Sequence, residues 1–140
     1  MISNDILNYA VINFFLGIVI FYIGRSLHEL GHYIIAKKYK LSNLKIYFNI
    51  FNNPFKGAHV HIEDHEYLSL EKNKRFFLLF SGFLSQWIFY GIVWIFFYYY
   101  IKKEEFYFLF SLVMFVLIIP DILLNSFSEK GDINRLFRLK

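Results

Sequence analysis

The chain of 140 residues contains no cysteine, so disulfide bonds and thiolate metal ligands are excluded. Proline is scarce, with two residues, and no stretch rich in proline, serine and glycine divides the chain. The net charge is +4, but no lysine- and arginine-rich stripe or recognition motif indicates a nucleic-acid partner. We therefore predict a single domain over residues 1–140 that does not bind nucleic acid.

Apolar and aromatic side chains are abundant. Hydrophobic residues make up 57% of the chain, with 19 Phe and 11 Tyr, and they form blocks long enough to cross a bilayer. The first predicted span covers residues 8–36, the second covers 76–101, and the third begins near residue 106. We expect the third span to reach residue 119 or 124, with Pro120 kinking or breaking it. The predicted fold class is an all-α membrane protein with about three transmembrane helices.

The segment between the first two predicted spans has a different pattern. Apolar residues at alternate positions from 44 to 50 predict a strand that lies near the membrane. A turn signal follows at Asn52-Asn53-Pro54, and residues 57–62 form a candidate second strand. We predict a small membrane-associated β-hairpin, with an edge to which an extended peptide can pair.

Basic residues are shared unevenly between the two sides of the predicted membrane domain. Most Lys and Arg residues lie in the 37–75 loop and in the C-terminal tail, whereas the opposite side offers Lys102 and Lys103. The positive-inside rule then places the loop and tail in the cytoplasm and the N-terminus outside. We expect an integral protein of a prokaryotic cell membrane, with the candidate site described next toward the cytoplasmic side.

An H-E-x-x-H pattern, from His28 to His32, lies at the end of the first apolar run. Residues four apart share a helix face, so His28 and His32 can point two imidazoles at one metal ion. Glu29 lies about a hundred degrees around the helix, where it can reach a water molecule rather than the metal. This is the layout of a zinc hydrolase with a carboxylate general base. The alternative is a pair of histidines that only form hydrogen bonds inside a bundle, but such groups are costly at membrane depth without a functional partner.

The order of these parts resembles the site-2 protease family of intramembrane zinc metalloproteases. The H-E-x-x-H motif matches that family's first element, and Gly57-Ala58-His59-Val60 resembles its loop strand. The second core helix of the family opens with a Gly-Pro-x-x-Asn-like signature, where this chain has Phe83 for Pro and Gln86 for Asn. The resemblance implies a zinc metalloendopeptidase that cleaves membrane-spanning or membrane-associated protein segments within the lipid bilayer. It also implies that Gln86 binds substrate, the alternative being a helix–helix contact.

The family's third zinc ligand is an aspartate, and the resemblance permits two registers for it. The family carries Asn-x-x-Pro followed by Asp-Gly in its third core segment. Matching Asn125 to the family's Asn makes Asp132 the ligand, and we prefer this register because it keeps a carboxylate at the correct distance. Matching Pro120 to the family's Pro leaves Asp121 as the second choice and the amide of Asn125 as a poorer one. Without a metal, Asp132 is suited to the N-cap of a last helix or to a solvated tail.

Two other functions stay open. A zinc peptidase of another class would use a glutamate as third ligand, with Glu63, Glu66 and Glu71 as candidates. A degenerate relative would bind a partner or a metal without cleaving, as the imperfect second and third signatures allow. Histidines in the loop can bind a second metal or cover the first, although plain surface positions are more common; they are His59, His61 and His65.

Overall fold

Three long helices dominate the computed structural model, which describes residues 4–42, 44–48, 58–101, 103–127 and 132–137. They are α1 (Asn4–Lys38), α3 (Lys72–Tyr100) and α4 (Glu104–Phe127). All three contain a segment long and apolar enough to cross a membrane, namely 6–38, 72–100 and 104–123. Large apolar side chains cover their outer surfaces, as at Phe15 and Phe115, which are 64% and 63% exposed. The prediction of a mostly helical fold with three candidate membrane spans is confirmed.

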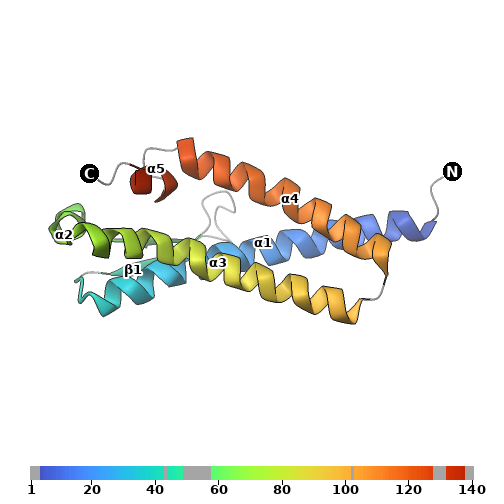
Figure 1. Ribbon diagram of the computed structural model, residues 1–140, viewed down its shortest axis with the longest axis horizontal. Helices are drawn as coiled ribbons and strands as arrows, with labels where there is room; N and C mark the ends of the chain where they lie inside the picture. The colour runs from blue at the N-terminus through green and yellow to red at the C-terminus, as the bar shows by residue number, and fades with distance from the viewer. Residues whose placement is uncertain (1–3, 43, 49–57, 102, 128–131, 138–140) are drawn as a thin grey trace.

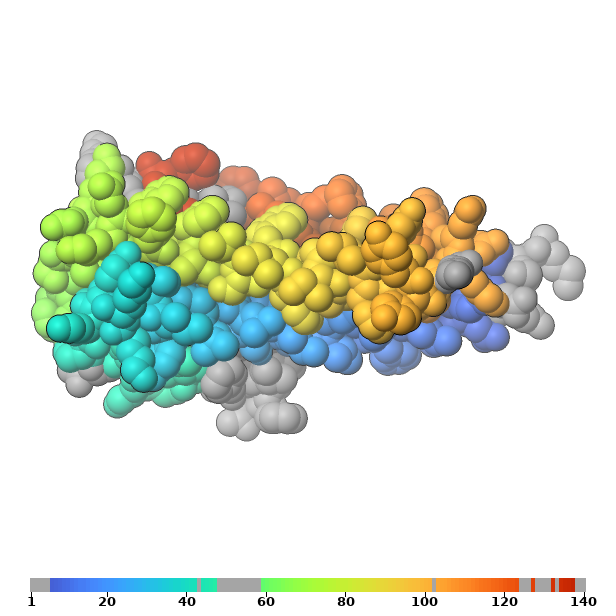
Figure 2. Space-filling model, turned by 60° about the horizontal axis from the view of Figure 1, so that its bottom comes forward, coloured from blue at the N-terminus to red at the C-terminus, as the bar shows by residue number. Residues whose placement is uncertain are grey.

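Helix α1 packs against both other long helices (Figure 1). Figure 2 shows α3 lying against α1 along the length of the molecule. Since lipid tails are as apolar as leucine, such helices associate through close packing and hydrogen bonds rather than through the hydrophobic effect. The central position of α1 matters because it carries the H-E-x-x-H motif.

The end of α1 is a Schellman motif. Lys40 adopts a left-handed conformation with φ of 58°, and its N–H donates to the carbonyl of Lys37 at 3.0 Å. The N–H of Leu41 donates to the carbonyl of Ala36 at 3.2 Å, which closes the six-residue turn. Lys37 and Lys38 in the last turn also complement the negative end of the helix dipole.

Helix α4 does not end at Pro120, which lies inside the helix. Of the two effects expected of this proline, a break of the third span is excluded, and the candidate membrane span continues to residue 123. Proline removes one backbone donor, but transmembrane helices tolerate it because neighbouring groups can satisfy the freed carbonyl.

A two-stranded antiparallel sheet connects α1 to the second half of the chain, as predicted. Strand β1 (Lys45–Phe48) pairs with β2 (Ala58–His61), with Ile46 opposite Val60. The predicted turn at Asn52-Asn53-Pro54 lies outside the described residues. The hairpin is a second layer against α1 at the end that carries the H-E-x-x-H motif.

Two short helices complete the fold. Helix α2 (Asp64–Ser69) precedes α3. Ser42, just after α1, donates its backbone N–H to Glu66 at 2.9 Å, and this contact ties α2 to the end of α1. Hydrogen bonds from Ser42 also hold the pKa of the Glu66 carboxyl below its ordinary value. Helix α5 (Asp132–Phe137) packs against α3 and α4, so it returns the C-terminal segment to the motif-bearing end of the bundle.

Candidate metal centre

His28 and His32 lie one turn apart on α1 and point toward α3. They are almost completely buried, with 1% and 6% of each residue exposed. Their Nε2 atoms approach to 3.0 Å. The four-residue spacing therefore brings both imidazoles to one point, as expected for a motif on a helix.

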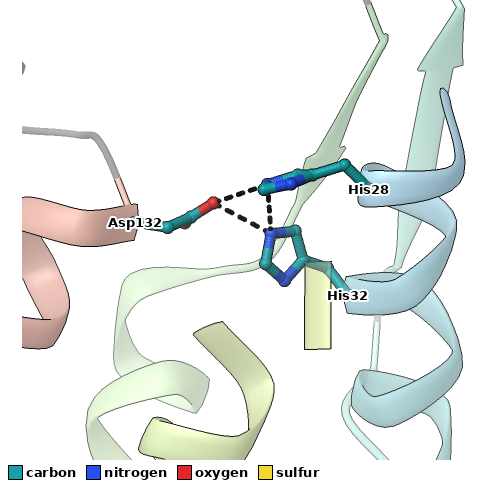
Figure 3. A group of neighbouring side chains, drawn as sticks. All are labelled: His28, His32 and Asp132. Atoms are coloured by element: carbon teal, nitrogen blue, oxygen red, sulfur yellow. Dashed lines mark hydrogen bonds and ion pairs between the residues drawn. The ribbon is translucent and has the colours of Figure 1, made fainter. Parts of the chain in front are cut away.

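Asp132 completes a group of three from the opposite side of the site (Figure 3). Its Oδ2 lies 2.9 Å from Nε2 of His28 and 2.9 Å from Nε2 of His32. Asp132 is the first residue of α5, more than a hundred positions along the chain from His28. Two imidazoles and a carboxylate oxygen meet here in an arrangement that could hold a metal ion.

The Asp132 carboxyl is set to stay ionised. Burial alone raises its pKa, but the hydrogen bonds with His28 and His32 outweigh that effect and hold the pKa well below the ordinary value. An ionised carboxylate is the form that binds metals.

The other ring nitrogen of each histidine is held by an oxygen atom. Nδ1 of His32 lies 2.7 Å from the carbonyl oxygen of Leu78, and Nδ1 of His28 lies 3.0 Å from Oε1 of Gln86. A carbonyl oxygen only accepts, so we assign the proton of each neutral ring to Nδ1. Both Nε2 atoms then present lone pairs to each other and to the carboxylate. Such a set holds a cation, either a proton on one Nε2, which then donates to Asp132, or a metal ion, so the residues fit a metal ion.

Gly82 of α3 makes the space for this arrangement. A Cβ atom at this position would collide with the His32 ring and would lie 2.8 Å from Nε2 of His28. Any side chain here would therefore enter the volume between the ligand atoms.

Gly31, inside the H-E-x-x-H motif, allows α1 and α3 to approach closely. A Cβ on Gly31 would collide with the Ser85 hydroxyl and with the backbone of Ser81. Small residues at a helix–helix contact let the two backbones approach, and Gly31 has this role on α1.

Glu29 lies beside the candidate metal centre but is not one of the three converging residues. It is 9% exposed, and its Oε2 accepts a hydrogen bond of 2.9 Å from the backbone N–H of Val60 in β2. Its position one residue from His28 turns the carboxylate away from the Nε2 pair and toward the hairpin. Such a carboxylate can act on a water molecule at the site rather than bind the metal.

Gln86, the predicted substrate-binding residue, is buried and is bonded at both ends of its amide. Its Oε1 faces His28, and its Nε2 donates to the hydroxyl of Tyr90 at 3.0 Å. These contacts orient a candidate ligand, which is how carbonyl groups commonly serve metal-binding histidines. A role in substrate binding stays a prediction.

The other candidate third ligands lie elsewhere. Asp121 forms an ion pair of 3.1 Å with Arg25, in which 18% and 24% of the side chains are exposed. Among the described residues, the three glutamates also have other partners: Glu63 pairs with His65, Glu66 with Ser42 and Glu71 with Lys74. The side chain of Asn125 lies outside the described part of the chain.

Within the described ranges, the loop histidines are not part of any group of three possible metal ligands. His59 stacks on Tyr47 with ring centroids 4.8 Å apart, and His65 faces Glu63 at 3.2 Å. This placement does not support a second metal site.

An apolar groove of about 330 Å³ adjoins the metal centre between α3, α4 and α5. Phe83, in its lining, also contacts the His28 ring edge-on, with centroids 4.9 Å apart. The remaining lining residues are Phe80, Leu84, Trp87, Ile122 and Leu136. The groove beside the site is therefore apolar.

Sequence reasoning missed several residues that shape the site. Val60 and Leu78 act through backbone atoms, which no side-chain pattern reveals. Tyr90 could have been found, because it lies four residues after Gln86 on the same face of an apolar helix.

The comparison with protein-family models decides the family. The model described as Peptidase family M50 matches residues 13–136 of the chain. The chain belongs to the site-2 protease family. The match spans both the H-E-x-x-H motif and Asp132, and it confirms the resemblance noted in the sequence. The comparisons with curated proteins and with solved structures gave no match. Family membership and three apolar helices together indicate an integral membrane protein of a protease family.

Proposed function

We propose that this chain is a membrane-embedded zinc metalloendopeptidase. The observation that carries the proposal is the convergence of His28 Nε2, His32 Nε2 and Asp132 Oδ2 beside the buried Glu29. Membership of a peptidase family adds support for hydrolysis of peptide bonds. A purely structural histidine pair would not need a third acceptor at the same point.

The donor set favours zinc. Two imidazoles and one carboxylate are typical of catalytic zinc sites, which keep a fourth position open. Magnesium and calcium prefer sets made of oxygen atoms alone. Donor atoms on a tetrahedral zinc lie about 3.3 Å apart. The three atoms here, at 2.9 to 3.0 Å, would need only a small outward movement.

Each residue then has a distinct role. When bound, zinc lowers the pKa of a water molecule at the open position and polarises the substrate carbonyl. With the metal in place, Glu29 would accept a proton from the attacking water and donate it to the leaving amine. His28 and His32 act as neutral ligands because their Nδ1–H groups are held by oxygen atoms. Asp132 adds a negative charge that offsets the cation.

The surroundings favour a substrate in or beside the bilayer. The histidines lie on a membrane-spanning helix, and the adjoining groove is apolar. The partners we propose are the lipid bilayer and a membrane protein or peptide whose backbone is locally unwound at the site. Lys37 and Lys38 lie just beyond the motif, and by the positive-inside rule this end of the bundle faces the cytoplasm of a prokaryotic cell.

The test compares the wild-type protein with E29Q in proteoliposomes. The probe is a single-span model protein that carries helix-breaking residues in its apolar segment. We expect E29Q to keep its zinc and to lose cleavage by about 100-fold or more, because it lacks the general base. Cleavage by E29Q at the wild-type rate would contradict the assignment. A zinc-loaded wild-type protein that cleaves nothing would favour a non-catalytic relative.

A further inference from the structure

The backbone of β2 contacts the proposed general base directly. The N–H of Val60 points away from β1 and donates to Oε2 of Glu29 at 2.9 Å. Val60 faces Ile46 across the hairpin, and in an antiparallel pair the residues alternate between sharing ladder hydrogen bonds and facing outward. Val60 therefore belongs to an outward-facing pair, and its N–H lies on the edge that faces α1.

This contact divides the two carboxylate oxygens of Glu29. Oε2 is held by the strand, and Oε1 would then be the oxygen that accepts a proton from an attacking water. Within the part of the chain that the structure describes, Val60 N–H is the hydrogen-bond donor to this carboxylate. A free glutamate side chain has many rotamers, and fixing it costs conformational entropy. A displacement of about 1 Å at a reacting group can slow catalysis about 100-fold.

We propose that the backbone N–H of Val60 is the positioning group for Glu29, so that the seat of the β-hairpin on α1 sets the rate of cleavage. The inference rests on the proposed function. It assigns the hairpin a part in the chemistry beyond offering an edge to an extended peptide. The N–H of Val60 is already used by Glu29, so a peptide that paired at this point would have to displace the general base.

A proline at position 60 removes this donor and leaves the ladder to β1 intact, because outward-facing edge positions of a strand accept proline. V60A loses most of the same side chain but keeps the N–H, so it is the reference for V60P. I46P is the matched control, since it removes the outward N–H of the facing residue on the opposite edge, away from Glu29.

We expect V60P to lower kcat about 10- to 100-fold relative to V60A, with little change in KM and an unchanged zinc content. I46P should not reproduce this loss. A merely structural role for the hairpin would instead lower kcat equally in V60P and I46P, which would overturn the inference. Equal kcat in V60P and V60A would overturn it as well.

A second readout does not depend on activity. The difference in thermal unfolding midpoint between V60P and V60A should be smaller in the E29A background than with Glu29, because the hydrogen bond then has no acceptor and only the backbone effect of proline is left. The same difference in both backgrounds would contradict the contact. If the zinc-loaded wild-type protein cleaves nothing, the proposed function fails; if it cleaves and V60P matches V60A, only this inference fails.

Discussion

The two halves of the helix bundle are held together in different ways. In the half away from the candidate metal centre, here called the far half, the three long helices meet in a buried cluster formed by Ile20, Tyr90, Phe106, Phe110 and Met114. Its buried polar group is Asn13, which donates to the carbonyl of Phe106 at 3.1 Å. The packing there is close, but few of the contacts depend on a particular chemical group.

In the half that holds the candidate metal centre, here called the site half, buried polar groups make the main contacts. His28, Gln86 and Tyr90 form a connected series, and Arg25 pairs with Asp121 nearby. Polar groups are costly at membrane depth unless each has a partner. We therefore expect the far half to tolerate substitutions that keep the side-chain volume. In the site half, a change of one atom can leave a partner unsatisfied.

A substitution at Gly82 should have the largest effect on zinc binding. We expect G82V to abolish zinc binding, because its side chain would occupy the space between the histidine rings. Zinc content measured by atomic absorption checks this result. G91A is the matched control on the same helix, since a Cβ at Gly91 meets nothing within 4 Å. Full zinc content in G82V would contradict the conclusion that Gly82 keeps the space between the histidine rings open.

Gln86 gives the next largest effect. Q86L keeps the volume but removes the oxygen that fixes Nδ1 of His28, and loss of such a partner typically costs about 10- to 100-fold in metal affinity. Competition with a chelator of known affinity measures the change. Y90F removes only the hydroxyl at the far end of the series, so its effect should be smaller. If Gln86 serves substrate alone, Q86L will bind zinc like the wild type.

A cavity in the far half should affect zinc least. Met114 is 1% exposed, and M114A should lower the free energy of unfolding by roughly 2 kcal/mol or more. Zinc affinity should stay within about twofold of the wild type, since distant sites act independently. Thermal unfolding in detergent, with chelator competition on the same samples, measures both quantities. A large loss of zinc affinity in M114A would show that the halves are coupled.

The far half and the hairpin were largely predictable from sequence. Long apolar runs mark membrane spans because lipid imposes a minimum length, and alternation from residue 44 marks a strand. The sequence left open whether Pro120 kinks or breaks the third span, because its effect depends on neighbouring groups that can satisfy the freed carbonyl.

The site half was predictable only where its residues are close in sequence. His28, Glu29 and His32 follow from helical spacing, whereas Asp132 rested on the family register rather than on any physical pattern. Helix α5 has six residues, too few for a periodic signal, and its seat depends on tertiary packing. The contacts of Leu78 and Val60 are made by backbone atoms, so the identity of those residues carries no trace of them.

The most direct test of the account is the zinc content of the purified, detergent-solubilised protein, measured beside H28A, D132A and E29Q. We expect one zinc per chain in the wild type and in E29Q. We expect no zinc in H28A and D132A, because each of these two variants lacks one of the three converging ligand atoms. Zinc retained by D132A would contradict the three-ligand centre. A wild-type protein that binds no zinc after reconstitution would contradict the proposed enzyme as a whole.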